Sequence, residues 1–94
     1  MKKAPMNLQT SASLGAVLGA LIGDAAGGTL EFLGRKPSAA EVANAMRLPG
    51  GGVFQLAPGQ FTDDGEMTVT LLRTLNASGG AYEPDLVATA YCEW

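Results

Sequence analysis

Residues 14–27 read LGAVLGALIGDAAG. Apolar side chains here recur at the i, i+3, i+4 and i+7 spacing of one helical face; they are Leu14, Val17, Leu18, Leu21, Ile22 and Ala25. Ser11 or Ser13 is the expected N-cap, and residues 1–10 are interpreted as a flexible N-terminal arm. The segment therefore predicts a first helix that ends near Gly27 or about one turn later.

Four glycines repeat every four residues along this helix: Gly15, Gly19, Gly23 and Gly27. An interior glycine destabilises a helix by about 1 kcal/mol relative to alanine, so the four together need a compensating role. A row of glycines lets a neighbouring backbone approach closely. We therefore expect a central helix with other helices packed against this row.

Further helical signals follow along the chain. Ser38 and Glu41 have the spacing of a capping box, which predicts a short helix that ends before Pro49. Another helix is expected from the Thr62 region to residues 76–80, and a last one opens at residues 83–85 and is still apolar at its end. Because no convincing strand pair or repeat is present, the sequence predicts an all-α fold.

Composition narrows the classes of function. A chain of 94 residues is one domain at most, and its 47% apolar content is too high for intrinsic disorder. A net charge of −3 lacks the basic footprint of a nucleic-acid binder. The chain has no His and one Cys, which excludes His-dependent catalytic pairs and an internal disulfide. Any metal ion bound here should therefore be a hard cation held by oxygen ligands.

The start of the chain imitates a targeting signal. The polar residues 7–13 separate Lys2 and Lys3 from the apolar run, which is unlike a secretory signal peptide. The run from Leu14 to Gly23 is about half the length of roughly 20 residues that a membrane-spanning helix needs. We therefore expect a cytoplasmic protein without membrane association.

Three oxygen-bearing residues stand in a row at Thr62, Asp63 and Asp64. One interpretation is a helix N-terminus, in which Asp63 and Glu66 form a capping box and the acids favour the helix dipole. The other is a Mg²⁺ site, because Mg²⁺ prefers carboxylate and hydroxyl oxygens and adjacent acids repel each other unless a cation lies between them. The spacing alone leaves both open.

Two further acids lie in apolar surroundings. A buried carboxylate is costly unless it is hydrogen-bonded, so Asp24 is expected to hold a neighbouring loop or helix end through backbone N–H groups. Glu31 comes seven residues later, on about the same face if the helix continues. It lies near glycines where a ligand could approach, or it is simply an exposed residue of the last turn.

Two segments together resemble the ADP-ribosylglycohydrolase family, which includes the dinitrogenase-reductase-activating glycohydrolase and the ADP-ribosylarginine hydrolases. The first segment is residues 18–27 (LGALIGDAAG) with Leu30-Glu31-Phe32, and the second is residues 58–68 (PGQFTDDGEMT). Their order and interval match the family pattern. The resemblance covers the chain from about residue 12 to its end.

The resemblance implies a compact all-α domain of about three times this length. It also implies two bound Mg²⁺ ions, for which Mn²⁺ often substitutes, with Thr62, Asp63 and Asp64 as metal ligands and with Glu31 and Asp63 as catalytic residues. The implied reaction is hydrolysis of the bond between ADP-ribose and an acceptor. That acceptor would belong to an ADP-ribosylated protein or a small ADP-ribosyl compound.

One departure from the family pattern follows Asp64. The family completes its metal site with a second cluster, Asp-x-Asp-[Thr/Ser], and no Asp-x-Asp occurs in this chain. Residues 11–94 are therefore interpreted as the N-terminal fragment of a single domain, inactive without its remaining ligands, with a further chain as a candidate partner. The alternative is a non-catalytic binding or interaction module of the same fold.

Overall fold

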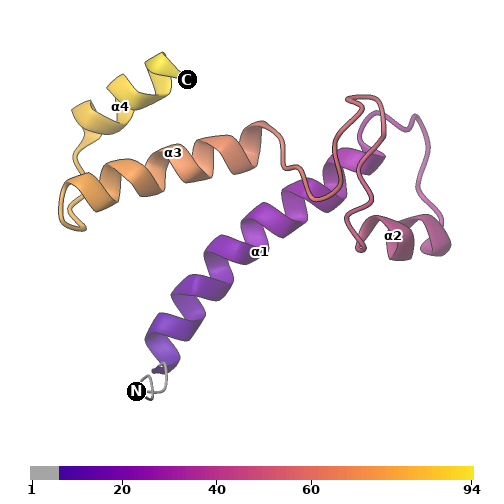
Figure 1. Ribbon diagram of the computed structural model, residues 1–94, viewed down its shortest axis with the longest axis horizontal. Helices are drawn as coiled ribbons and strands as arrows, with labels where there is room; N and C mark the ends of the chain where they lie inside the picture. Colours follow the sequence, from indigo (N-terminus) through magenta and orange to yellow (C-terminus); the bar gives the residue numbers. More distant parts are fainter. Residues whose placement is uncertain (1–6) are drawn as a thin grey trace.

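A computed structural model describes residues 7–94, and this part of the chain contains α-helices but no strand (Figure 1). The helices are α1 (Leu8–Leu30), α2 (Ala39–Ala45), α3 (Asp63–Ala77) and α4 (Pro84–Glu93). The connection between α2 and α3 holds a single antiparallel bridge, from Gly51 to Leu56. The prediction of an all-α fold is confirmed.

The first helix begins earlier than the sequence suggested. Asn7 is its N-cap, and the Asn7 side chain accepts a hydrogen bond of 2.8 Å from the backbone N–H of Thr10. Asparagine is as good an N-cap as serine, so the prediction of Ser11 or Ser13 in this position is wrong. Residues 8–10 of the expected arm are helical, whereas residues 1–6 lie outside the described residues.

α1 is also longer than its apolar run. It has 23 residues, and by length and composition alone it is long enough and apolar enough to cross a membrane. One such helix near an N-terminus is weak evidence, because core helices of water-soluble proteins and signal sequences meet the same criterion. The C-terminal half of α1 packs against the rest of this chain, where Ala25 and Ala26 are buried.

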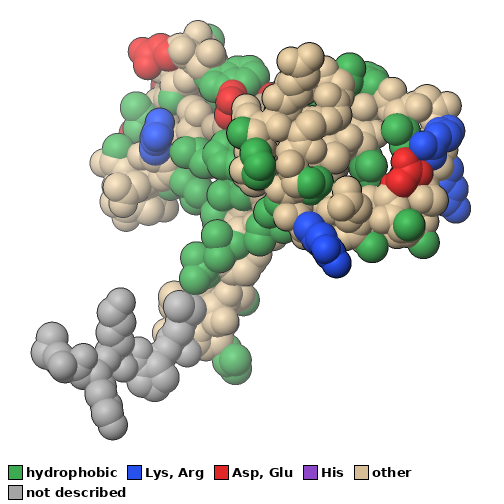
Figure 2. Space-filling model, turned by 45° about the vertical axis from the view of Figure 1, so that its right-hand side comes forward, with side chains coloured by type: hydrophobic (Ala, Val, Ile, Leu, Met, Phe, Trp, Pro, Cys, Tyr) green, Lys and Arg blue, Asp and Glu red, His purple; other side chains and the backbone are tan. Residues whose placement is uncertain are grey.

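The helices form an open arrangement with few buried side chains. α3 contacts α1 and leads away from it, α4 packs on α3, and α2 lies beside the C-terminal end of α1 (Figure 1). The buried apolar residues are Ala25, Ala26, Ala45, Leu56 and Val87. Large apolar side chains stay partly exposed along α1, including Leu14, Leu18 and Ile22. Figure 2 shows exposed apolar side chains, in green, on the surface of the molecule. α3 thus packs against both α1 and α4, and the carboxylates of Asp24, Asp63 and Asp64 lie at its junction with α1.

The glycine row does not serve the packing that we expected from it. No atom of another element lies within 4 Å of the position that an added Cβ would take at these residues: Gly15, Gly19, Gly23 and Gly27. Within the described residues, the prediction that helices pack against the row is therefore wrong. The close approach is at Gly28 instead, where an added Cβ would lie 2.8 Å from Leu56 Cδ1 and 3.1 Å from Thr62 Cγ2.

Candidate metal centre

The N-terminus of α3 is capped by a side chain from α1. Asp24 Oδ2 accepts hydrogen bonds of 2.7 Å from the backbone N–H groups of Thr62 and Gly65. Asp24 Oδ1 accepts a hydrogen bond of 2.5 Å from the Thr62 hydroxyl. The first backbone N–H groups of a helix have no partner within that helix, and Asp24 supplies one from 38 residues earlier in the chain. The prediction that Asp24 holds a helix end is confirmed.

The capping box that we considered for Asp63 and Glu66 is wrong. Thr62 is the N-cap of α3, and its side chain makes no capping bond to the helix. The Glu66 carboxylate instead accepts a hydrogen bond of 2.8 Å from the indole N–H of Trp94. Because the carboxylate of Asp24 caps the N-terminus of α3, the side chains of Asp63 and Asp64 are not needed as caps.

The surroundings of Asp24 favour its charged form. Partial burial raises the pKa of Asp24, but the hydrogen bonds from the Thr62 hydroxyl, the Gly65 N–H and the Thr62 N–H together lower it below its ordinary value. Hydrogen bonds that donate to a carboxylate stabilise the ionised form. Asp24 is therefore a negatively charged group at the start of α3, where the helix dipole also favours an anion.

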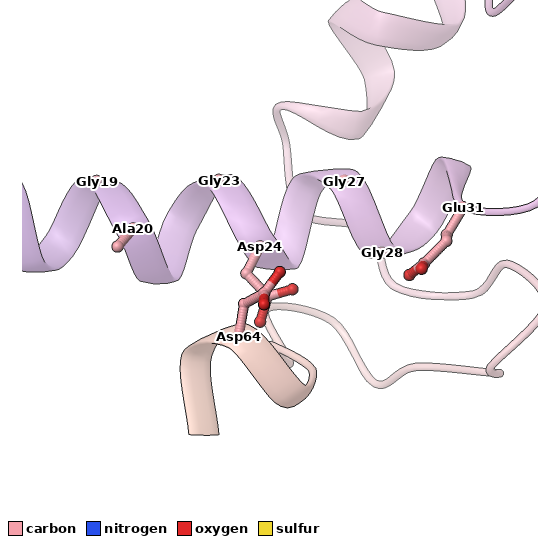
Figure 3. Close-up of a pocket in the computed structure, with 8 residues that line it drawn as sticks. All are labelled: Gly19, Ala20, Gly23, Asp24, Gly27, Gly28, Glu31 and Asp64. Carbon is pink, nitrogen blue, oxygen red and sulfur yellow. The ribbon is translucent and has the colours of Figure 1, made fainter. Parts of the chain in front are cut away.

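Three carboxylates meet at this junction. One oxygen from each of Asp24, Asp63 and Asp64 lies within 4.8 Å of the others, with Asp24 half-buried and the other two exposed. Figure 3 shows the carboxylate of Asp64, on the first turn of α3, facing that of Asp24 on α1. The Thr62 hydroxyl belongs to the same group, because it lies 3.2 Å from Asp63 Oδ1. This set of hard oxygen donors fits Mg²⁺ or Mn²⁺.

An open groove of about 430 Å³ runs along α1 beside these acids (Figure 3). It is lined by Gly19, Ala20, Gly23, Asp24, Gly27, Gly28, Glu31 and Asp64. Glu31 is the C-cap of α1 and is exposed. The structure therefore brings Glu31 and Asp64 to one groove, although Glu31 does not belong to the group of three close carboxylates. The sequence indicated the shared face of Asp24 and Glu31 but not that α3 would deliver Asp64 to it.

Gly65 is a site residue that the sequence reasoning did not single out. The Gly65 N–H is one of the two backbone groups that donate a hydrogen bond to Asp24 Oδ2. A Cβ at this position would lie 2.5 Å from Cδ2 of Phe61, so only glycine fits without a shift of that ring. The available signal was a glycine directly after two aspartates at a helix start, where a residue with higher helix propensity would be expected.

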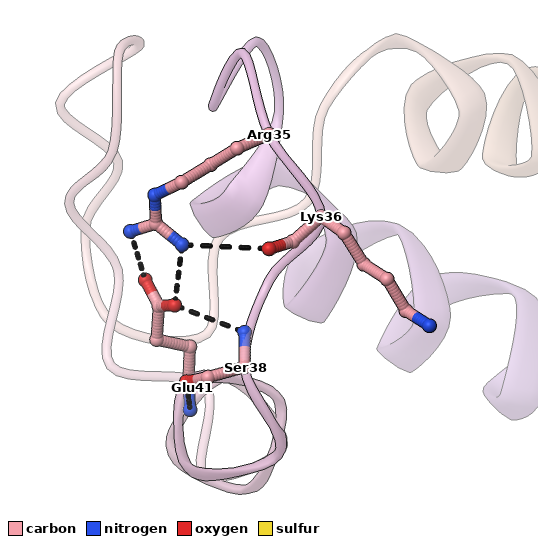
Figure 4. Close-up of polar contacts among 4 residues, drawn as sticks. All are labelled: Arg35, Lys36, Ser38 and Glu41. Atoms are coloured by element: carbon pink, nitrogen blue, oxygen red, sulfur yellow. Dashed lines mark hydrogen bonds and ion pairs between the residues drawn. The ribbon is translucent and has the colours of Figure 1, made fainter.

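The loop that follows Glu31 is fastened to α2 by an ion pair (Figure 4). Arg35 donates two hydrogen bonds to the Glu41 carboxylate, of 2.7 Å and 2.9 Å. The same carboxylate accepts the N–H of Ser38 at 3.0 Å, and the Ser38 hydroxyl accepts the N–H of Glu41 at 3.1 Å. The capping box predicted for Ser38 and Glu41 is confirmed, and Arg35 extends it across the loop.

This ion pair predicts a pH dependence of stability. The Arg35 guanidinium, with the N–H and hydroxyl of Ser38, lowers the pKa of Glu41 from 4.5 to about 2. A carboxyl whose pKa is lower in the folded state stabilises the fold above its unfolded pKa and loses this effect as the pH falls through the folded value. The melting temperature of Glu41→Gln should therefore lie below that of the unchanged chain at pH 6, and the difference should close towards pH 2. Circular dichroism against temperature measures it, and a difference independent of pH would contradict this assignment.

The family model and the relatives that match this chain all belong to one class of protein. The family model described as ADP-ribosylglycohydrolase matches residues 5–94. The chain is 45% identical over 67 residues to the ADP-ribosyl-dinitrogen reductase glycohydrolase of Rhodospirillum rubrum. It is 45% identical over 80 residues to an ADP-ribosylarginine hydrolase of Pseudomonas putida, and 40% identical over 83 residues to a putative ADP-ribosyl glycohydrolase of Acanthamoeba polyphaga mimivirus.

These alignments cover most of this chain but little of each relative. They include 71%, 85% and 84% of the chain, and 23%, 20% and 25% of the Rhodospirillum, Pseudomonas and mimivirus proteins. The chain thus spans a quarter or less of the length of these relatives. No solved structure matches the chain with significance.

Proposed function

The chain belongs to the ADP-ribosylglycohydrolase family, and from this premise we propose that it supplies one half of a divalent-cation site for hydrolysing the bond between ADP-ribose and an acceptor. The observation that carries the proposal is the grouping of acids at the start of α3. Carboxylate oxygens of Asp24, Asp63 and Asp64 lie within 4.8 Å of one another, with the Thr62 hydroxyl beside them. Like charges this close favour a bound cation.

The proposed cation is Mg²⁺, for which Mn²⁺ would substitute. Thr62, Asp63 and Asp64 would hold it through one hydroxyl and two carboxylates. When bound, such an ion polarises an oxygen of substrate or water and stabilises the negative charge that develops on it. The exposure of Asp63 and Asp64 supports this role, because both carboxylates are accessible to an ion and Asp64 also lines the groove.

Glu31 and Asp63 are the proposed catalytic residues. The groove that Glu31 shares with Asp64 can place the Glu31 carboxylate beside a ribose bound near the cation. A carboxylate in this position can accept a proton from water or from a ribose hydroxyl. Asp63 Oδ1 lies 3.2 Å from the Thr62 hydroxyl oxygen, and no described hydrogen bond reaches Asp63 Oδ2, which is free to orient the attacking water.

The substrate class follows from the relatives. The proposed substrate is an ADP-ribosylated protein, linked through arginine as the name of the Pseudomonas relative indicates, or a small ADP-ribosyl compound. The remaining ligands would come from sequence that corresponds to the other three quarters of the relatives, in the same chain or in a partner chain. We therefore propose a cytoplasmic hydrolase that needs neither nucleic acid nor membrane, and that residues 1–94 alone do not hydrolyse the bond.

A chimeric enzyme tests this proposal. Residues 7–94 would replace the matching segment of the Rhodospirillum relative. The chimera is expected to release ADP-ribose from ADP-ribosylated dinitrogen reductase in the presence of Mg²⁺ or Mn²⁺, whereas the 94-residue chain alone releases none. Turnover by the isolated chain would refute the half-site, and a folded chimera that binds Mn²⁺ without turnover would favour a non-catalytic binding module.

A further inference from the structure

Asp24 differs from Asp63 and Asp64 in the hydrogen bonds that its carboxylate accepts. Oδ2 accepts hydrogen bonds from two backbone N–H groups, and Oδ1 accepts one from the Thr62 hydroxyl. Among the described hydrogen bonds, Asp63 accepts only the longer contact of 3.2 Å from the same hydroxyl, and none reaches the carboxylate of Asp64. Asp24 is therefore the one carboxylate of the three whose two oxygens are both engaged within the protein.

The Thr62 hydroxyl has one proton and two lone pairs. Its oxygen lies 2.5 Å from Asp24 Oδ1 and 3.2 Å from Asp63 Oδ1. The shorter distance and the half-buried position of Asp24 direct the proton towards Asp24. The lone pairs of the Thr62 oxygen then remain available on the side of Asp63 and Asp64.

We infer that Asp24 is a positioning residue: it holds the proton of the Thr62 hydroxyl away from the cation, so that Thr62 presents a lone pair as a ligand. Asp24 is not itself a ligand. The inference rests on the proposed function, because it concerns the same cation. It assigns to Asp24 a role beyond capping α3, since a cap needs only the two bonds from N–H groups.

Asp24→Asn separates these roles. The amide oxygen can take the position of Oδ2 and still accept the N–H groups of Thr62 and Gly65. The amide nitrogen then stands at the position of Oδ1 and must donate to the Thr62 oxygen, which turns the hydroxyl proton towards the cation. The variant therefore still caps α3, but the Thr62 hydroxyl no longer presents a lone pair to the cation.

Mn²⁺ titration of the full 94-residue chain, followed by the electron paramagnetic resonance signal of free Mn²⁺, measures the effect. Asp24→Asn should weaken Mn²⁺ binding at least about tenfold, in the range found when residues that orient metal ligands are changed, with an unchanged far-ultraviolet circular dichroism spectrum. Asp85→Asn is the matched control, because it makes the same chemical change in the exposed first turn of α4. It should bind Mn²⁺ like the unchanged chain.

A second pair of variants keeps the inference testable if Asp24→Asn does not fold. Thr62→Val retains the backbone N–H that Asp24 accepts but has no hydroxyl, and it should weaken Mn²⁺ binding at least about tenfold. Thr62→Ser retains the hydroxyl and should bind within about threefold of the unchanged chain. If Thr62→Val binds as well as Thr62→Ser, the Thr62 hydroxyl is not a ligand and the inference is overturned.

The double variant distinguishes positioning from simple loss of charge. If Asp24 acts through the Thr62 hydroxyl, Asp24→Asn should weaken binding by less than about threefold when Thr62 is already valine. An undiminished effect there would mean that only the charge of Asp24 matters, which overturns the inference and leaves the proposed cation site intact. If the 94-residue chain binds no Mn²⁺, the same variants are titrated in the chimera, which carries the remaining ligands. If the chimera binds no Mn²⁺ either, the proposed site and the inference both fall.

Discussion

Asp64→Asn is expected to lower the affinity of the chain for Mn²⁺ by about a hundredfold or more. Two unit charges 4 Å apart attract each other by about 4 kcal/mol at an effective dielectric constant near 20, and each 1.4 kcal/mol corresponds to a factor of ten. Loss of the charge of Asp64 removes an interaction of this size with a divalent cation. The titration that monitors free Mn²⁺ measures it directly.

The stability of the same variant separates the two interpretations of the Thr-Asp-Asp run. No described hydrogen bond ends on the carboxylate of Asp64, and Asp24 already caps α3. Without metal, Asp64→Asn should therefore change the free energy of unfolding by less than about 1 kcal/mol, the range of a charge near a helix N-terminus. A capping role predicts the reverse result, with a clear loss of stability and unchanged Mn²⁺ binding. Asp85→Asn again serves as the control.

Glu31→Gln is expected to reduce kcat of the chimera by a factor of about 10² to 10⁴, the usual contribution of a general acid or base. The amide keeps the shape of the side chain but cannot accept a proton. Mn²⁺ affinity should change less than about tenfold, because Glu31 lies outside the group of three close carboxylates. Turnover of ADP-ribosylated dinitrogen reductase at saturating Mn²⁺ measures the effect.

Glu83→Gln provides the matched control for this prediction. Glu83 is exposed and precedes α4, away from the groove that Glu31 lines. The same chemical change there should leave kcat within about twofold, as expected of a surface substitution. Equal losses of kcat in the two variants would show that Glu31 has no catalytic role. A loss of Mn²⁺ affinity as large as that of Asp64→Asn would make Glu31 a metal ligand instead.

The local signals in the sequence were sufficient to locate the helices of the described residues, but not every helix boundary. The capping box of Ser38 and Glu41 set the start of α2, and Pro84 set that of α4, because these interactions lie within a few residues. The start of α1 was missed since Asn7 is an equally good cap further upstream. Family membership also followed from two short motifs in order, and the match over residues 5–94 confirms it.

The sequence could not show which distant element each of these residues contacts in the fold. The cost of burying a carboxylate predicted that Asp24 would hold a helix end, but only the fold identifies that end as α3. The capping box at Asp63 and Glu66 was plausible locally and is wrong because a side chain from α1 replaces it. The same holds for the glycine row. The spacing of the glycines indicates room for a neighbouring element but not which element, if any, occupies that space.

The most direct test is to locate the cation. Crystals of the chimera grown with Mn²⁺ would give an anomalous difference map at the manganese absorption edge. The account predicts a peak about 2.0–2.3 Å from the Thr62 hydroxyl and from carboxylate oxygens of Asp63 and Asp64, with Asp24 still bonded to Thr62. If crystals of the folded chimera grown in saturating Mn²⁺ show no anomalous peak beside these three residues, the proposed cation site is contradicted.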